Sequence, residues 1–296
     1  MYSIGIDIGG MSAKIGLVRD FEIKTVRTIP TNSNTAYDQF IRQVCSAIRE
    51  LIQESEDKEL TMVGISSCGL IDSAKGRITY SNNIKWEDKS IVADINEEFG
   101  VPVRIANDAK CALLAEAVIG AGKNYDRVCM ITLGTGVGGG FITNRKLDIG
   151  NPYSDASGIL GHTTVMAGGR QCTCGRRGCL EAYSSATALI ASYKEKTGQE
   201  LNAKEIFDRV RLGEAASTEV FEEFRYYLGE GLVGICNILR PQIIVIGGGV
   251  SKSADLFTDY LEAYVNQGIY GGNAIPVHVT VAKLGNDAGM IGATLL

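Results

Sequence analysis

The sequence contains no run of apolar residues near the roughly 20 that a membrane-spanning helix needs. It also lacks any segment that concentrates lysine and arginine, and its 34 acidic residues outnumber its 29 basic ones, for a net charge of −5. Because nucleic-acid binders gather basic charge on one face or tail, we expect no nucleic-acid partner. The N-terminus shows no signal peptide, so we expect a soluble, cytoplasmic protein without a membrane partner.

Histidine is scarce, with two residues in the chain, and one of them precedes a cysteine cluster. His162, Cys172, Cys174 and Cys179 offer one imidazole and three thiols, which is a common donor set of closed zinc sites. We predict a structural zinc ion, because four protein ligands leave no position for a reactive water. Coincidental surface cysteines are the weaker alternative. The remaining cysteines lie in apolar segments, as buried thiols do: Cys45, Cys68, Cys111, Cys129 and Cys236.

The length of 296 residues exceeds a usual single domain, so we expect two lobes, each with its own core. Apolar periodicity predicts an α/β pattern in which a hairpin precedes a helix, a strand, another strand and a helix. The expected segments are 3–8, 13–18, 23–29, 36–55, 62–66, 101–106 and 109–119. The same plan then starts again with a strand at 127–132, a glycine turn at 134–140 and a strand at 141–144. This repetition indicates an internal duplication. A long helix that Pro241 ends and a strand at 243–246 follow, and His278 is expected as an ordinary strand residue.

Three glycine-rich turns each follow an apolar strand, at 7–14, 133–140 and 246–251. Glycine allows a phosphate to approach backbone N–H groups closely, although any single turn of this kind is more often a plain hairpin. The chain has no GxxxxGK[ST] signature, and the second turn leads into a strand, unlike a dinucleotide fingerprint. Turns that face one nucleotide fit better, with Asp7 holding magnesium through water and Thr135 donating a hydroxyl to phosphate.

The pair Asn107-Asp108 stands at a strand end and opens a helix, where α/β folds present catalytic groups. An N-cap pair is the plain alternative. Asp108 suits the base that phosphoryl transfer to a sugar hydroxyl needs, and Glu181, just after the last cysteine, suits a ligand of a sugar hydroxyl.

Together these motifs resemble the ROK family of repressors, uncharacterised reading frames and sugar kinases. The segments that carry the resemblance are DIGG at 7–10, NDA at 107–109, LGTGVGGG at 133–140, GH followed by CTCGRRGCLE through Glu181, IGGGVS at 246–251 and NDAGMIGA at 286–293. The resemblance implies an actin/hexokinase-like (ribonuclease H-like) α/β fold with two lobes and a cleft between them. It implies lobes 1–118 with the helix at about 286–296, and 119–285 with the zinc loop 162–179.

The resemblance also implies ATP-dependent phosphorylation of a hexose, usually at O6, with magnesium, and Asp108 as the catalytic base. The sugar-binding positions that it implies are Asn107, Asp108, His162, Glu181, Gly69 and Asn83. The nucleotide-binding positions are Asp7, Gly9, Gly10, Ser12, Lys14, Gly134, Thr135, Gly136, Gly138, Gly248 and Gly249. His162 would bind zinc through one ring nitrogen and the sugar through the other.

Three departures from the family pattern bear on the substrate. Ile159 replaces a glutamate that the family uses to contact the sugar, with Ser154 and Asp155 as nearby candidates to compensate. Met11 replaces a common threonine, so Ser12 would supply the hydroxyl. Segment 66–69 replaces a Gly-x-Pro-Gly turn beside the sugar.

Repressors of the family carry a DNA-binding segment before the first turn, which here begins at residue 7, so we expect a kinase. The competing hypothesis is a catalytically weak sugar-binding or regulatory protein; an actin-like structural protein has little support. Glucose is the leading substrate, followed by N-acetylmannosamine or N-acetylglucosamine, and we expect a homodimer.

Overall fold

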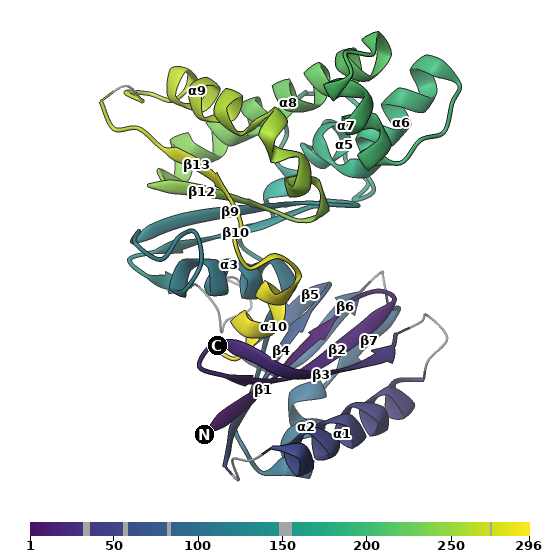
Figure 1. Ribbon diagram of the computed structural model, residues 1–296, viewed down its shortest axis with the longest axis vertical. Coiled ribbons are helices and arrows are strands. Elements are labelled where there is room, and N and C mark those ends of the chain that lie inside the picture. The colour runs from purple at the N-terminus through teal and green to yellow at the C-terminus, as the bar shows by residue number, and fades with distance from the viewer. Residues whose placement is uncertain (32–35, 56–58, 82–83, 148–155, 273) are drawn as a thin grey trace. The chain divides into compact units, whose positions relative to one another are not determined.

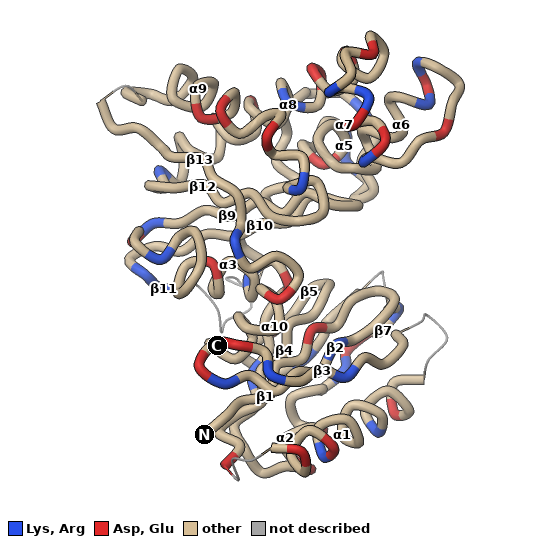
Figure 2. The backbone as a smooth tube through the Cα atoms, viewed as in Figure 1, with Lys and Arg blue, Asp and Glu red and all other residues tan. Residues whose placement is uncertain are grey.

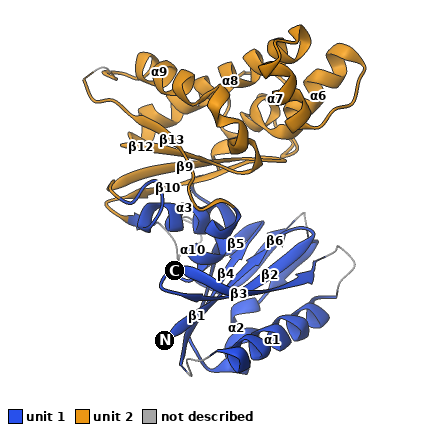
Figure 3. Ribbon diagram, in the orientation of Figure 1, with its two compact units in different colours: residues 1–123, 146–157, 286–296 blue, residues 124–145, 158–285 orange. Residues whose placement is uncertain are grey.

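The computed structural model describes residues 1–31, 36–55, 59–81, 84–147, 156–272 and 274–296 (Figure 1). The chain forms two compact units (Figure 3). Unit 1 comprises residues 1–123, 146–157 and 286–296, and unit 2 comprises residues 124–145 and 158–285. No helix in the described ranges has the length and apolar character that crossing a membrane requires.

Unit 1 is built on a five-stranded sheet with the order β3-β2-β1-β4-β8. Its strands are β1 (Tyr2–Ile8), β2 (Ser12–Arg19), β3 (Glu22–Pro30), β4 (Leu60–Ser67) and β8 (Val103–Asn107). A smaller sheet joins β5 (Leu70–Asp72), β6 (Arg77–Ser81) and β7 (Trp86–Lys89). The helices of unit 1 are α1 (Tyr37–Glu54), α2 (Ile91–Phe99), α3 (Asp108–Val118) and α10 (Ala288–Ala293), the last preceded by the turn η3 (Gly285–Asp287). The apolar stripe of α1 is buried in this unit's core, as its periodicity predicts.

A row of glycines crosses the middle of this sheet and receives α10. Gly16, Gly5 and Gly64 are paired neighbours on β2, β1 and β4. A Cβ atom would lie 2.4 Å from the Met290 carbonyl oxygen at Gly5 and 1.9 Å from the Ala293 carbonyl oxygen at Gly64. The missing side chains therefore let α10 pack directly on the strands, which ties the C-terminal segment to the N-terminal sheet.

Unit 2 has its core between a second sheet and a layer of helices (Figure 1). The sheet has the order β11-β10-β9-β12-β13. Its strands in unit 2 are β9 (Arg127–Leu133), β10 (Val137–Thr143), β12 (Ile243–Gly247) and β13 (His278–Val281), and the edge strand β11 (Lys146–Leu147) falls in the residue range of unit 1. The helical elements are η1 (Leu160–His162), α5 (Glu181–Ser184), α6 (Ala186–Thr197), α7 (Ala203–Arg211), α8 (Ala215–Leu239), η2 (Gly249–Leu256) and α9 (Thr258–Gly268).

The two sheets follow one plan, as the predicted duplication requires. In each sheet a central strand, β1 or β9, pairs antiparallel with the next strand in the chain and parallel with β4 or β12. The fourth strand, β4 or β12, then pairs parallel with β8 or β13. The carboxyl ends of the parallel strands therefore meet at one edge of each sheet, where α/β proteins place their functional groups.

The predicted turn 134–140 is too long. Strand β10 begins at Val137, so Gly138 lies inside a strand and pairs with Thr132, and the turn is confined to residues 134–136. The glycines of β10 serve packing, since a Cβ at Gly139 would lie 2.7 Å from Cδ1 of Leu160. A glycine run in sequence does not distinguish a turn from a strand that another segment approaches closely.

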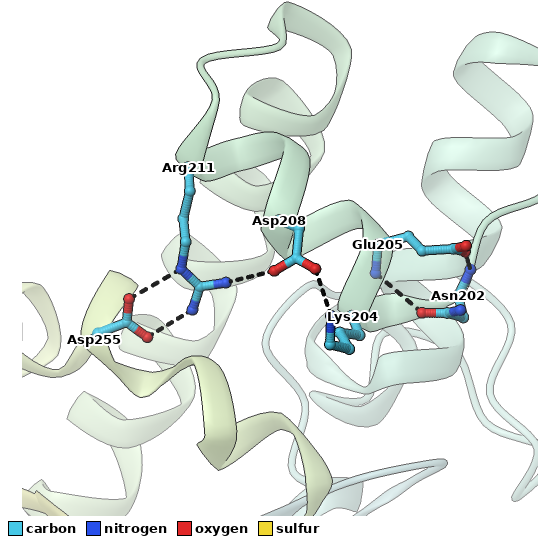
Figure 4. Close-up of polar contacts among 6 residues, drawn as sticks. All are labelled: Asn202, Lys204, Glu205, Asp208, Arg211 and Asp255. Carbon is cyan, nitrogen blue, oxygen red and sulfur yellow. Dashed lines mark hydrogen bonds and ion pairs between the residues drawn. The ribbon is translucent and has the colours of Figure 1, made fainter.

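Helix α7 begins at a reciprocal cap and is tied to η2 by an arginine fork (Figure 4). The side chain of Asn202 accepts the N–H of Glu205, whose carboxylate accepts the N–H of Asn202. Arg211 donates from two nitrogens to the carboxylate of Asp255, at 2.7 and 3.2 Å. Elsewhere basic and acidic residues are interspersed along both units, without a basic stripe on the described elements (Figure 2).

Candidate functional site

Three polar residues lie at the carboxyl edge of the unit 1 sheet because their strands are parallel neighbours. Asp7 on β1 pairs with Ser66 on β4, and the next residue of β4, Ser67, pairs with Asn107 on β8. Ser66 donates its hydroxyl hydrogen to Oδ1 of Asp7 at 2.7 Å. The edge therefore carries the two carboxylates that the sequence singled out, with Asp7 on β1 and Asp108 directly after β8, and β4 lies between those two strands.

Burial raises the pKa of Asp7, and the Ser66 hydrogen bond and the charge of Lys14 act in the opposite direction. Lys14 is the cross-strand partner of Asp7 on β2. Gly289, in α10, leaves room for this carboxylate, because a Cβ there would lie 2.9 Å from Oδ1 of Asp7. The group is thus held closely on one side by protein atoms, and Oδ2 has no hydrogen-bond partner among the described residues.

Asn107 is the N-cap of α3, as the plain interpretation of the pair predicts. Its Oδ1 accepts the N–H of Ala109 at 3.0 Å, and its Nδ2 donates to the carbonyl oxygen of Gly69 at 3.2 Å. Gly69 has a positive φ of 107°, and a Cβ there would lie 2.5 Å from the Tyr80 carbonyl oxygen. Asn107 therefore joins the end of β8 to the turn that follows β4.

Asp108 opens α3 and presents a carboxylate whose surface is open to solvent. Although the side chain reaches the surface, the protein atoms packed around it reduce its hydration and so raise its pKa to about 6. The charge of Asp7 makes a smaller contribution in the same direction. The N–H of Ala109, which donates to Oδ1 at 2.8 Å, acts against that rise. A carboxylate that is solvent-accessible and titrates near neutrality is suited to accept a proton.

The turn between β9 and β10 in unit 2 is fixed by donors from a single segment. The N–H of Ala186 donates to the Gly134 carbonyl oxygen at 2.8 Å, and the hydroxyl of Thr187 donates to the Thr135 carbonyl oxygen at 2.7 Å. Within the described part of the chain, the N–H groups of Thr135 and Gly136 have no hydrogen-bond partner. Two adjacent free N–H groups at a sheet edge are typical of an anion-binding turn.

Glu181 lies between this turn and the cysteine loop. Its Oε2 accepts the N–H of Val137 at 3.0 Å, and its Oε1 accepts the hydroxyl of Thr173 at 2.9 Å. The absence of a side chain at Gly136 lets the carboxylate approach the turn closely, since a Cβ there would lie 2.5 Å from Oε2.

His162, Cys172, Cys174 and Cys179 converge, and their ligand atoms all lie within 4.8 Å of one another. Sγ of Cys172 lies 3.5 Å from Nδ1 of His162, and Sγ of Cys174 lies 3.7 Å from Sγ of Cys179. A tetrahedral zinc ion with its usual bond lengths sets S–N and S–S separations of about 3.5 and 3.8 Å. The donor set and its spacing therefore fit one zinc ion, with Nδ1 of His162 as the nitrogen ligand.

The other predicted positions divide between the two units. Gly9, Gly10, Ser12 and Lys14 lie in the β1–β2 hairpin, where the Gly9 N–H donates to the Ser12 carbonyl oxygen at 3.0 Å. Gly248, with φ of 81°, and Gly249 form the turn from β12 into η2. Gly138 is displaced from its predicted turn into β10, because the turn closes at Gly136.

Asn83, Ser154 and Asp155 lie outside the described residues. Ile159 is exposed at the start of η1.

A cavity of about 300 Å³ in unit 2 adjoins both the turn and the cysteine loop. Thr135 and Glu181 stand on its wall, followed by small residues of α6 such as Ala188 and Ala191. The pocket therefore adjoins the turn at Thr135.

Sequence reasoning missed four contributors to these sites. Ser66 and Gly289 shape the surroundings of Asp7, and Thr173 and Val137 hold Glu181. Ser66 had a visible signal, since it stands in the departure at 66–69. The part played by the Val137 N–H has no signature in the sequence, because every residue except proline carries that group.

A family model described as the ROK family matches residues 3–296. A glucokinase of Halalkalibacterium halodurans is 34% identical, over 98% of this chain and 92% of that protein. A xylose repressor of Bacillus subtilis is 30% identical, over 98% of this chain and 75% of the repressor. A ROK family glucokinase from Streptomyces griseus, solved in complex with glucose and AMPPNP, superposes with a TM-score of 0.80 at 28% identity, over 99% of this chain and 98% of that one. The likeness over nearly the whole chain agrees with the expected actin/hexokinase-like fold.

Proposed function

The chain belongs to the ROK family, and on that premise we propose that it is an ATP-dependent kinase that phosphorylates a hexose hydroxyl. The observation that carries the proposal is Asp108, a solvent-accessible carboxylate at the carboxyl edge of a sheet with a pKa of about 6. Binding of a sugar alone involves no proton transfer, so such a proton acceptor favours a kinase over a sugar-binding regulator. The glucokinases similar to this chain support glucose as the acceptor, and O6 is the expected hydroxyl.

In this reaction Asp108 accepts the proton of the sugar hydroxyl while the hydroxyl oxygen attacks the γ-phosphorus of ATP. The bond from that phosphorus to the bridging oxygen breaks, and ADP leaves with the electron pair. A pKa of about 6 leaves Asp108 mostly ionised at neutral pH, yet basic enough to hold the proton as the transfer proceeds.

The nucleotide would be held by the glycine turns. The free N–H groups of Thr135 and Gly136 suit the phosphate oxygens, and the hydroxyl of Thr135 adds a further donor. The small side chains of the adjoining cavity leave space beside that turn for the remainder of the nucleotide. In unit 1 the β1–β2 turn at Gly9 and Gly10, with Ser12 and Lys14 after it, would supply further phosphate contacts.

Magnesium fits the surroundings of Asp7. One oxygen is fixed by Ser66, and the other has no partner among the described residues, which suits contact through the water shell that Mg²⁺ retains. When bound, the ion supplies charge neutralisation on the phosphates.

Zinc is proposed as a structural ion held by His162, Cys172, Cys174 and Cys179, whose spacing fits tetrahedral coordination. Because Nδ1 of His162 faces the sulfurs, Nε2 remains for a sugar hydroxyl. Asn107, Glu181 and Gly69 are proposed as further sugar contacts. Ile159, exposed where the family has a glutamate, leaves N-acylhexosamines as alternative substrates.

The test is release of ADP with a panel of glucose, mannose, N-acetylglucosamine and N-acetylmannosamine. We expect turnover with at least one sugar, and a loss of about a hundredfold to ten-thousandfold in Asp108→Asn, since general-base catalysis contributes ~10²–10⁴. Full turnover in folded Asp108→Asn would remove the base assignment.

A sugar-binding regulatory protein is the second candidate, favoured by Ile159 and by the similarity to a xylose repressor. Sugar binding by calorimetry without ADP release across the panel would favour it.

We further propose that units 1 and 2 are the two lobes, and that the chain acts as a homodimer in the cytoplasm. The eight described cysteines are all free thiols, which suits a reducing compartment. Exposed apolar side chains on and near α8 and α9, among them Ile238 and Tyr270, suit a contact between copies. Light scattering tests the dimer.

A further inference from the structure

One side chain of the cysteine loop is not a metal ligand and instead contacts a residue of the candidate active site. Thr173 stands between Cys172 and Cys174, is exposed, and donates its hydroxyl hydrogen to Oε1 of Glu181 at 2.9 Å. Sγ of Cys172 lies 3.8 Å from the same oxygen. The loop therefore contacts Glu181 at a second point besides the covalent connection through Cys179.

The opposite oxygen of Glu181 reaches the glycine turn. Oε2 accepts the N–H of Val137 at 3.0 Å, directly after the two free N–H groups of Thr135 and Gly136. Hydrogen bonds to an ionised carboxylate are stronger and more directional than neutral ones. A carboxylate held at both oxygens by two different segments has a fixed orientation, so it sets the distance between those segments.

The remaining attachments of the turn come from the same stretch of chain. Ala186 and Thr187 donate to the carbonyl oxygens of Gly134 and Thr135, and Glu181 accepts from Val137. All three attachments lie within residues 181–187, which start two residues after the last cysteine of the cluster. Displacement of Glu181 would therefore move one end of the turn while the other end stays fixed.

We propose that Thr173 is a positioning residue that acts through Glu181 on the turn 134–137, so that the metal loop sets the placement of the phosphate-binding N–H groups. This inference rests on the proposed kinase function, in which that turn holds the phosphates of ATP. It assigns Glu181 a second task beside contact with the sugar, and it gives Thr173 a task separate from metal binding.

The direct readout is amide hydrogen exchange of peptides that cover residues 133–140. It reports the hydrogen bond from the Val137 N–H to Glu181 and does not need turnover. In Thr173→Val, which keeps the shape and removes the donor, we expect exchange at Val137 to quicken by about threefold to tenfold. Thr173→Ser keeps a hydroxyl and should restore the wild-type rate. Thr164→Val is the matched control, because Thr164 lies in the same loop and accepts a hydrogen bond from Arg176 without contacting Glu181.

The second readout is affinity for Mg·ADP by calorimetry, with KM for ATP where turnover is present. Thr173→Val should weaken the binding of Mg·ADP about threefold to tenfold, whereas Thr173→Ser and Thr164→Val should bind it as tightly as the wild type. Thr173→Ala serves as a second variant with the same expectation, and thermal unfolding verifies that each variant is folded.

Unchanged exchange and unchanged nucleotide affinity in both Thr173→Val and Thr173→Ala would overturn the inference. Loss of zinc from these variants would also overturn it, because the effect would then come from the metal site itself. Absence of turnover in the wild type with every sugar would instead count against the proposed function, and the exchange rates would still decide the role of Thr173.

Discussion

Ser66 donates its hydroxyl hydrogen to Oδ1 of Asp7 over 2.7 Å, from a paired position on the neighbouring parallel strand. Burial has the larger effect and raises the pKa of Asp7, whereas the Ser66 hydrogen bond acts against that rise and leaves Oδ2 as the oxygen without a described partner. The Ser66 hydrogen bond therefore orients the proposed magnesium contact and favours its ionised form.

Replacement of Ser66 by alanine should raise the magnesium concentration needed for half-maximal ADP release by about threefold to tenfold, because the hydrogen bond that orients Asp7 is lost. That bond forms in the metal-free protein too, so only part of its contribution affects metal binding. The difference from wild type should grow as the pH falls. Loss of the Ser66 bond raises the pKa of Asp7 further, so more of its carboxyl group is protonated at low pH than in the wild type. Ser67→Ala is the control, because the Ser67 hydroxyl donates to the Cys68 carbonyl oxygen. Equal magnesium dependence in both variants would contradict the role of Ser66.

The pH dependence of kcat/KM should follow Asp108. Its pKa is raised to about 6, and the ionised form is the one that accepts a proton, so activity is present above pH 6 and is lost as the pH falls through that value. At pH 5 about a tenth of the activity at high pH should remain. Rates from pH 4.5 to 8 in saturating magnesium provide the check, and a flat profile across pH 6 would argue against Asp108 as the base.

Much of the fold and of the candidate site could be predicted from the sequence, because these features depend on residues that lie close together in the chain. The strands next to Asp7 and Asp108 are short apolar runs, and the metal donors lie within 18 residues of one another. The predicted N-cap at Asn107 and the repeat of the sheet plan are also confirmed. What escaped prediction depends on long-range approach: Gly138 and Gly139 are strand residues because Leu160 and its neighbours pack against β10. The contact of Glu181 with a backbone N–H 44 positions away is of the same kind.

Gly64→Ala should destabilise unit 1 without touching a proposed ligand contact. The added Cβ would lie 1.9 Å from the Ala293 carbonyl oxygen, so α10 must shift, and overpacking of this kind costs about 1–3 kcal/mol. Thermal unfolding should show a lower midpoint. Gly234→Ala is the control, since nothing lies within 4 Å of a Cβ at that site in α8, and alanine favours a helix. A midpoint for Gly64→Ala at or above that of wild type would mean that α10 does not pack as described.

Metal analysis of the purified protein should find about one zinc ion per chain, bound by the His162 cluster. Cys174→Ser should lose it, whereas Cys45→Ala, a change at a buried thiol in α1, should retain it. Because the ion binds the folded chain, its removal by a chelator should lower the unfolding midpoint, and added zinc should restore it. Zinc retained in full by Cys174→Ser would exclude a four-ligand site.

Restoring a carboxylate at position 159 should strengthen sugar binding. Ile159 is 51% exposed and immediately precedes η1, which carries His162, and the family places a sugar-contacting glutamate there. A charge-assisted hydrogen bond contributes about 1.5–3 kcal/mol, so Ile159→Glu should lower KM for the preferred hexose by one order of magnitude or more. KM for ATP should stay within about twofold, because the change adds a sugar contact only. Ile159→Gln, in which glutamine has the shape of glutamate without its charge, should lower KM for the hexose by a smaller factor. If Ile159→Glu instead raises KM for every hexose, isoleucine forms part of a pocket adapted to another substituent, and the N-acylhexosamines become the substrates to examine.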